Sequence, residues 1–532
     1  MPAITRIIPV CLLILANTTY SHATRYHVAM NASGTASGLS WENAFTSLQE
    51  ALSIVIPGDE IWVAAGQYKP TSGTSRTISF QLRSGVNMFG GFAGTETSLN
   101  ERDIAANPTV LNGDIGEPGT STDNSHSVVT ADLLTIPTVL DGFRIMNGYS
   151  GSGSGYNGGG MRVTNTLAGR LTVRNCALVN NYSGTYGGGI YLGTAKLTLE
   201  NCDLINNSAG TGGDGGAILN GNNNGGESSV LIIRDSRFTN NAARRGACLF
   251  NNIGYDTLLI ERSIFTNNTS EISILTFDGF NEARVLNSYI IGNTVNGSSE
   301  NVLYVNASSE MDRFSMINCT VAHNYNVYSG SLQEEIIKVL DTQHVIQNSI
   351  IHGNTAYNGR QASTNVVITN SIVQGGHSNG TDIIDLDPQF AAPYTGTPTN
   401  FDASAFDYHP LSSSPAINVG DNDLVAATSL FDLDGEERIQ GGVVDLGCYE
   451  SDLTVSVGEP RTHHGWFFET MHNELHFTAT SGLPTTPITI YDPTGKRMAE
   501  YGTRGNVVHI ELPAGIYIAA SAELGWLKIV VD

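Results

Sequence analysis

The chain has 532 residues, with 50 acidic and 26 basic side chains and a formal charge of −24. This acidity argues against a protein that binds the backbone of DNA or RNA, because phosphate contacts depend on Lys and Arg. Only 14% of the residues are charged and 40% are apolar, which excludes a disordered chain. The 59 glycines follow no strict triplet, which excludes collagen.

The first 23 residues predict a secretory signal peptide. Arg6 is their only charged residue, an apolar run follows at 7–16, and a small-residue cleavage site stands at 21–23. The apolar run is much shorter than the roughly 20 residues that a membrane-spanning helix needs. We therefore expect cleavage after Ala23 and an exported chain without a transmembrane segment.

The exported chain would keep five cysteines, an odd number with no C-x-x-C pair. This pattern predicts neither a disulfide scaffold nor a structural zinc site. Cys176, Cys202 and Cys319 share one position of a repeat that runs through the middle of the chain, and we expect them to be small core residues.

This repeat is an eleven-residue pattern that recurs eight times, at intervals of 22 to 34 residues. In its first copy Leu171 and Val173 alternate with polar residues, and Cys176 and Leu178 resume the alternation after Asn175. Each copy therefore predicts two short strands joined by a one-residue corner. Such a unit buries its apolar face only by stacking on its neighbours, which predicts a parallel β-solenoid. The copies are 171–181, 197–207, 231–241, 258–268, 283–293, 314–324, 344–354 and 365–375.

The corner residue is Asn in most copies. Asn adopts the left-handed backbone easily, and stacked Asn side chains form ladders, so we expect an asparagine ladder at the corner. The next position is always Cys or Ser, because a tight corner admits only small inward side chains. The corner residues are Asn175, Asn201, Asp235, Arg262, Asn287, Asn318, Asn348 and Asn370.

The residue before the corner alternates in charge through four consecutive copies, in the order Arg174, Glu200, Arg234, Glu261. We expect these side chains to face solvent and to pair weakly between stacked strands. A ligand-binding stripe is the alternative interpretation.

Gly-rich elements stand about a dozen residues after a corner and predict tight turns that enter the next strand. A nucleotide-binding loop would need a helix directly after the glycines, and the sequence predicts none there. The elements are 158–161, 187–190, 215–218 and 246–249.

Two further parts follow the repeats. Residues 387–452 predict a closing module, in which 432–435 matches only the beginning of a calcium loop. We therefore predict no metal ligands, with a bound Ca²⁺ as the alternative. Residues 453–532 alternate apolar strands with turns at a spacing that predicts a small antiparallel β-sandwich.

The repeats resemble those of right-handed parallel β-helix proteins with the pectin-lyase-like fold, in particular secreted bacterial proteins with N-C-x-F-x-x-N and G-G-G-I-Y repeats. This resemblance covers about residues 25–450. It implies an all-β protein with a right-handed parallel β-helix over 24–386 and a first strand within 58–68. The amphipathic segment 41–55 would be a helix that caps the open edge of the stack.

The two C-terminal parts resemble other bacterial modules. Residues 387–452, with the string at 445–450, resemble the closing module of cell-surface β-helix proteins, a group named for an unidentified surface anchor; this implies that Arg438 pairs with a carboxylate. Residues 453–532, with the turn at 491–496, resemble the C-terminal sorting domain of the type nine secretion system of Bacteroidota. The resemblance implies the secretion machinery as a partner and a location outside a Gram-negative cell or on its outer membrane.

The fold alone does not decide the function, because pectin-lyase-like folds host lyases, hydrolases and non-catalytic stalks. The characteristic strings of the galacturonan hydrolases and pectate lyases of this fold do not occur in the chain. We therefore predict a monomeric, non-catalytic protein for adhesion or glycan contact. The alternatives are a polysaccharide lyase or glycoside hydrolase with an unrecognised site, and a structural stalk.

No catalytic residue can be assigned from the sequence. The candidate substrate-binding residues are Arg244, Arg245, Asp203 and Asp235. Two adjacent arginines can clamp an acidic sugar, although a solvated loop is the simpler interpretation. Carboxylates on neighbouring coils can provide the pair that glycoside hydrolysis requires.

Other charged residues of the repeat zone are weaker candidates. They are Arg237, Lys338 and Asp256. The neighbouring pair Glu334 and Glu335 is expected to be a solvated loop charge.

Overall fold

The structure, a computed structural model, describes residues 23–451 apart from short segments, and beyond residue 465 it describes seven strands alone. The chain divides into two compact units, Met1–Ser451 and Asp452–Asp532, which are described separately. The segments that the structure does not describe before residue 466 are 1–22, 152–156, 222–228, 253–256, 298–300, 308, 327–334, 357–358, 395, 397–404, 426–428 and 452–465.

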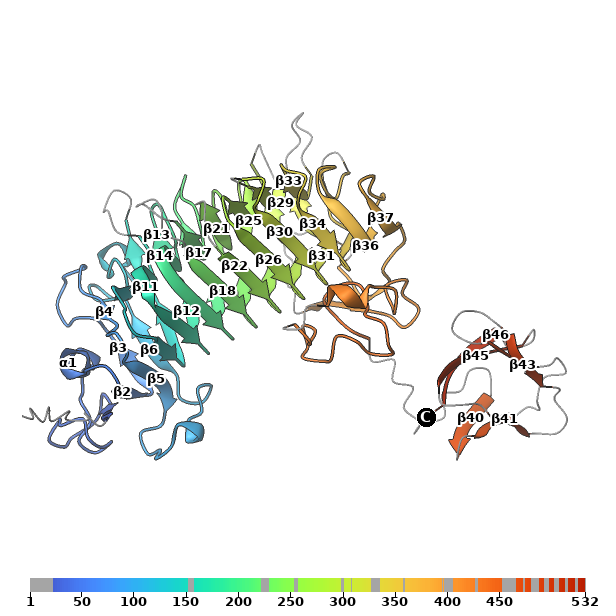
Figure 1. Ribbon diagram of the computed structural model, residues 1–532. Coiled ribbons are helices and arrows are strands. Elements are labelled where there is room, and N and C mark those ends of the chain that lie inside the picture. Colours follow the sequence, from blue (N-terminus) through green and yellow to red (C-terminus); the bar gives the residue numbers. More distant parts are fainter. Residues whose placement is uncertain are drawn as a thin grey trace, which may run out of the picture. The chain divides into compact units, whose positions relative to one another are not determined.

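The first unit is a parallel β-helix. Each coil adds one strand to each of up to three parallel stacks, and to a short strip of two-residue strands (Figure 1). Every strand is hydrogen-bonded to the equivalent strands of the coils before and after it, about 4.8 Å away. The stacking direction is therefore the axis of the helix, as the repeats predict.

The first and second stacks contain the two strands that each repeat copy predicts. The first consists of β1 (Arg25–Val28), β2 (Glu60–Ala64), β5 (Asn87–Phe92), β8 (Thr138–Asp141), the second halves of β11 (Met161–Arg174) and β14 (Ile190–Glu200), β18 (Val230–Arg234), β22 (Thr257–Glu261), β26 (Glu282–Leu286), β30 (Arg313–Ile317), β34 (Val345–Gln347), β36 (Val367–Val373) and β37 (Gly380–Ile384). The second consists of β3 (Gly66–Tyr68), β6 (Thr109–Asn112), β9 (Phe143–Met146), β12 (Ala177–Val179), β15 (Asp203–Ile205), β19 (Arg237–Thr239), β23 (Ile264–Thr266), β27 (Tyr289–Ile291), β31 (Thr320–Ala322), β35 (Ile350–His352) and the end of β36.

A third stack follows the Gly-rich turns. It consists of β4 (Phe80–Gln81), β7 (Val129–Asp132), the first halves of β11 and β14, β17 (Ile218–Asn220), β21 (Leu249–Asn252), β25 (Ser273–Asp278), β29 (Asn301–Asn306) and β33 (Ile337–Val339). The strip between the second and third stacks consists of β10 (Tyr149–Ser150), β13 (Tyr182–Ser183), β16 (Ser208–Ala209), β20 (Ala242–Ala243), β24 (Thr269–Ser270), β28 (Thr294–Val295) and β32 (Tyr325–Asn326).

The apolar positions of the repeat fill the interior of the coils. Leu171, Val173 and Leu178 are fully buried and Cys176 is 3% exposed. Their counterparts in the next copy are also buried, so the predicted strand register is confirmed; a shift of one residue would have reversed every side chain.

All eight predicted corner residues adopt the left-handed backbone, with φ between 43° and 53°. The predicted asparagine ladder at the corner is present between the first two copies, where Asn201 Nδ2 donates to Asn175 Oδ1 at 2.8 Å. A longer ladder lies at the last Asn of the repeat, where Asn241 Nδ2 donates to Asn268 Oδ1 at 3.0 Å. The side chains of this second ladder point inward and are buried. The ladder residues are Asn181, Asn207, Asn241, Asn268, Asn293, Asn324 and Asn354.

The four residues before the corners stack in the predicted order, Arg174 beside Glu200, Arg234 and Glu261. The expectation that they all face solvent was wrong. Arg174 and Glu200 are half-buried, and Glu261 is only 2% exposed. Glu261 tolerates burial because its carboxylate accepts hydrogen bonds from Arg234 at 2.9 Å and Arg262 at 3.0 Å.

The α-helix α1 (Leu48–Ile54) lies at the N-terminal end of the β-helix and is shorter than the predicted segment 41–55. Its buried Leu and Ala side chains pack against the first coil (Figure 1). The predicted first strand at 58–68 is two strands, β2 and β3, and β1 precedes both.

Three short 3-10 helices complete the described helices: η1 (Leu99–Glu101), η2 (Ser121–Asp123) and η5 (Asn422–Leu424). No helix in the described part of the chain is both long and apolar enough to cross a membrane.

The closing module packs on the second stack, where Phe390 and Tyr408 join one apolar cluster with Tyr289 and Ile350. It contains the antiparallel pair β38 (Phe390–Ala392) and β39 (Asp407–Pro410). Arg438 is 1% exposed and lies 3.1 Å from the Glu450 carboxylate, so the ion pair that the resemblance implied is present.

The second unit has two antiparallel sheets, as expected of its turn-separated strands, whereas their packing as a sandwich stays a prediction. One sheet is β40 (Trp466–Met471), β41 (Glu474–Ala479) and β44 (Val507–Glu511). The other is β42 (Ile488–Tyr491), β43 (Arg497–Tyr501), β45 (Gly515–Ser521) and β46 (Gly525–Val531).

Candidate functional site

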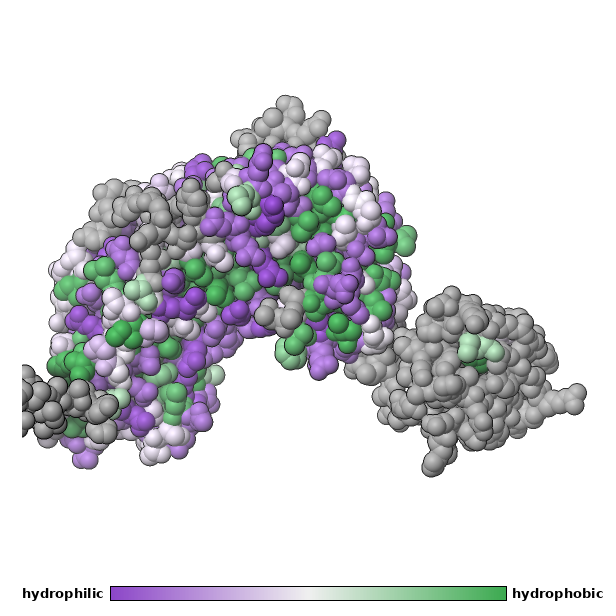
Figure 2. Space-filling view, viewed as in Figure 1, coloured by the Kyte–Doolittle hydropathy of each residue, from purple (hydrophilic) through white to green (hydrophobic). Residues whose placement is uncertain are grey.

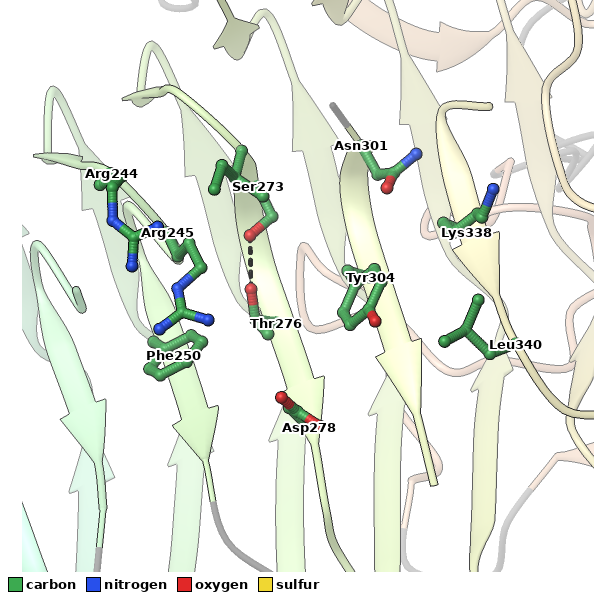
Figure 3. A pocket seen from close by; sticks show the side chains of 11 residues that line it. Arg244, Arg245, Phe250, Ser273, Thr276, Asp278, Asn301, Tyr304, Lys338 and Leu340 are labelled. Atoms are coloured by element: carbon green, nitrogen blue, oxygen red, sulfur yellow. Dashed lines mark hydrogen bonds between the residues drawn. The ribbon is translucent and has the colours of Figure 1, made fainter. Parts of the chain in front are cut away.

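A groove of about 400 Å³ lies on the third stack and crosses four consecutive coils (Figure 3). Figure 2 shows hydrophilic residues intermixed with apolar ones over the part of the surface where β25, β29 and β33 lie. The groove is lined by Arg244, Arg245, Phe250, Ile272, Ser273, Thr276, Asp278, Asn301, Tyr304, Lys338 and Leu340.

One row of side chains runs along the groove. Phe250 pairs with Thr276, Thr276 with Tyr304, and Tyr304 with Lys338, each on the next strand of the stack. Because adjacent strands are about 4.8 Å apart, this row spans about 14 Å parallel to the helix axis. A ligand that follows the groove therefore meets a new coil at every step.

The first end of the groove carries two arginines. Arg244 Nη2 lies 3.2 Å from Asp214 Oδ1, and Arg245 Nη2 lies 2.7 Å from Asp214 Oδ2. The Arg245 guanidinium also lies over the Phe250 ring at 4.5 Å, a cation–π arrangement. Hydrogen bonding to Asp214 raises the pKa of Arg245. Two guanidinium groups share one carboxylate, so this end keeps a net positive charge.

The opposite end carries Lys338. Its Nζ lies 3.2 Å from Glu335 Oε2, and Arg360 Nη1 lies 3.8 Å from Glu335 Oε1. Glu335 is 6% exposed, so the expectation that it is a solvated loop charge was wrong; it is buried because it holds these two cations. Glu334 lies outside the described residues. This end, too, has one more positive than negative charge.

The centre of the groove is uncharged except for Asp278. Asn306 Nδ2 donates to Asp278 Oδ1 at 2.8 Å, and the hydroxyls of Ser273 and Thr276 are hydrogen-bonded to each other. Burial raises the pKa of Tyr304, so its phenol stays protonated at neutral pH and can donate a hydrogen bond.

The structure brings together only some of the residues singled out in the sequence. Arg244 and Arg245 line the same groove as Lys338, but at its opposite end. Asp203 lies on the second stack, 3.9 Å from Arg237, and Asp235 stands at a corner, 2.7 Å from Arg262. Asp256 lies outside the described residues.

Tyr304, Asp278 and Asn301 were not recognised from the sequence. They belong to β25 and β29, which fall between the copies of the repeat and have no Gly-rich element before them. The available signal was the end of β29, where Leu303 and Val305 are buried and Tyr304 between them is half-exposed.

Within the described residues, no group of three or more His, Cys, Asp or Glu side chains is arranged to hold a metal ion. In the segment that matches the beginning of a calcium loop, Asp432 accepts backbone hydrogen bonds from Asp434, Glu436 and Glu450 at 2.8–2.9 Å. Its carboxylate thus orders the closing module itself.

No protein-family model matches the chain, and no curated protein matches it in sequence. Several solved structures are similar at low identity. Pectate lyase Pel9A has a TM-score of 0.41 and 15% identity over 81% of this chain and 97% of its own. A rhamnogalacturonan lyase has a TM-score of 0.33 and 12% identity over 69% and 85%, respectively. The complex of XylC with xylose has a TM-score of 0.25 and 11% identity over 96% and 100%.

Proposed function

We propose that this protein is a secreted or cell-surface β-helix protein that binds acidic glycans along the third-stack groove without cleaving them. The observation that carries the proposal is the row from Phe250 to Lys338, which presents ring, hydroxyl and cationic groups at successive coils. A linear polymer offers one sugar after another along its length, so its repeat can follow the coils. Arginine and lysine at the two ends suit carboxylate or sulfate groups.

The composition of the groove favours binding over catalysis. Hydrolysis of a glycosidic bond uses two carboxyl groups at the scissile bond, and among the described residues that line the groove Asp278 is the only carboxylate. A lyase needs a base, but the raised pKa of Tyr304 keeps the phenol protonated, and Lys338 is held by Glu335. The experiment must distinguish a glycan-binding protein from the three alternatives, which are a lyase, a hydrolase and a structural stalk.

The test incubates the purified chain with acidic and neutral polysaccharides and measures both binding and products. We expect binding to acidic polymers that weakens as salt is added, and no unsaturated or reducing ends. Arg245→Gln should weaken binding about tenfold, since it removes one charged contact. Arg237→Gln, an exposed arginine of the second stack, is the matched control and should bind normally. Product formation would contradict the non-catalytic function, and absence of binding would favour the stalk.

We further propose how the protein reaches its location and how the coils are wound. Residues 1–23 would direct export, and 453–532 would be recognised by type nine secretion machinery and could fold as a sandwich. Right-handed winding is supported by the general preference of parallel strand crossovers. A reporter fused to 453–532 should leave the cell in a strain with this machinery and stay in the periplasm of a strain without it.

A further inference from the structure

We infer that the groove selects a linear glycan in which anionic sugars are separated by two uncharged sugars, over a chain with an anion on every sugar. The inference rests on the proposed glycan-binding function and specifies its ligand. It follows from the order of charges along the groove, which is positive, negative and positive.

The two positive ends are separate sites. Arg244 and Arg245 share Asp214 at one end, and Lys338 shares Glu335 with Arg360 at the other. Both clusters keep one unbalanced positive charge. Phe250, beneath Arg245, and Lys338 are three coil steps apart, about 14 Å. One anionic group cannot reach both clusters, so each end recognises its own sugar.

The middle of the groove disfavours an anion. Asp278 is half-buried there, and its carboxylate accepts a hydrogen bond from Asn306 Nδ2 at 2.8 Å. The other central groups, Ser273, Thr276 and Asn301, are uncharged. A carboxylate placed among them would meet like charge in a partly desolvated site, which is costly.

An uncharged sugar fits the same place. Its hydroxyl groups can donate to Asp278, and the Tyr304 ring lies on the groove row between Thr276 and Lys338, where a sugar ring can pack on it (Figure 3). A sugar unit in an extended chain is about as long as one coil step, so two units lie between those held at the two ends. In a chain charged at every unit, one of these two sugars would bring its anion to Asp278.

The experiment compares three hexasaccharides of matched length by calorimetric titration of the full exported chain. One carries uronates three units apart with two uncharged N-acetylhexosamines between them, one is uronate throughout, and one is uncharged. We expect the spaced-uronate chain to bind at least about tenfold more tightly than the all-uronate chain, and the uncharged chain to bind most weakly. A chain with sulfates in place of the spaced uronates then distinguishes sulfate from carboxylate as the anion.

The Asp278→Asn variant tests whether the charge of Asp278 causes the preference against the all-uronate chain. It keeps a hydrogen-bonding group beside Asn306 but removes the charge, so all-uronate binding should strengthen and the preference should fall severalfold. Asp278→Ser is a second way to remove the charge if the first variant does not fold. Asp382→Asn, an exposed acid on β37, is the control and should leave the preference unchanged. Equal or tighter binding of the all-uronate chain, or an unchanged preference in both Asp278 variants, would overturn the inference while leaving glycan binding intact. Failure of all three ligands to bind would instead overturn the proposed function.

Discussion

The first four copies of the repeat end in two neighbouring asparagines that have different structural roles. Asn240 is exposed and has φ of 57°, a conformation that Asn and Gly tolerate better than other residues. Asn241 is fully buried, donates to Leu204 O at 2.8 Å and to Asn268 at 3.0 Å, and accepts from Asn207. The first residue turns the chain, whereas the second satisfies buried backbone groups between coils.

Substitution of these two residues should separate the two tasks. Asn241→Ala removes a buried link and leaves its partners without hydrogen bonds, so we expect a loss of about 2 kcal/mol in the free energy of unfolding. Asn240→Gly keeps access to the left-handed backbone and should change stability by less than about 0.5 kcal/mol. Urea unfolding of both variants measures the difference. Equal midpoints would contradict the assignment of the ladder to the second asparagine.

At the scale of elements, His409 joins two segments of the closing module. The ring of this β39 residue is hydrogen-bonded to Asp407 on its own strand, and its Nε2 lies 2.7 Å from Asp434 Oδ2 in the loop after residue 430. The ring also lies on Tyr449, with centroids 3.9 Å apart. Burial lowers the pKa of His409, but the hydrogen bonds to Asp434 and Asp407 outweigh it, and the pKa is raised overall.

The closing module should therefore loosen as the solution becomes alkaline. The imidazole has a higher pKa when folded than the usual 6.5, so its contribution to stability is fully present below about pH 6.5 and is lost as pH rises through the folded value. Hydrogen-exchange protection of 407–410 and 432–436 should fall over this range. His409→Gln should reduce the dependence without abolishing it, because burial also raises the pKa of Glu450 in the same module to about 8. His377→Gln, which alters a histidine of the solenoid, should leave the dependence unchanged. Protection that does not vary with pH in the unaltered chain would contradict this role.

Also at this scale, the first two stacks could be predicted throughout, but the third only in part. Leu171, Val173, Cys176 and Leu178 follow a period of two around a left-handed corner, which is a local pattern. The Gly-rich turns predicted the start of β11, β14, β17 and β21, whereas no such motif precedes β25, β29 and β33, which carry most of the groove. Arg244 and Arg245 can be singled out in the sequence as adjacent cations. Their placement in the same groove as Lys338 cannot, because the intervals between copies vary from 22 to 34 residues. Only the stacked register brings them to one groove.

At the scale of the whole molecule, the edges of the stack are protected in different ways. The first coil is packed by α1, whose Leu48, Ala51 and Leu52 are buried. The last strand, β37, is largely exposed, but Asp382 interrupts it with φ of 56° and a charge. A kinked, charged edge is a poor template for pairing with another chain, which is consistent with the monomer expected from the sequence.

The division of the chain at residue 451 leads to the last prediction. The solenoid, the groove and the closing module all lie within Met1–Ser451, and the two C-terminal sheets form a compact unit of their own. A protein of residues 24–451 should therefore fold without the second unit, show the same main thermal transition as the longer chain, and bind acidic glycans within about twofold of its affinity, because all the described residues of the groove lie within Met1–Ser451. Calorimetry and titration of both proteins measure this. A weaker affinity in the shorter protein, with its main transition unchanged, would mean that 452–532 takes part in binding.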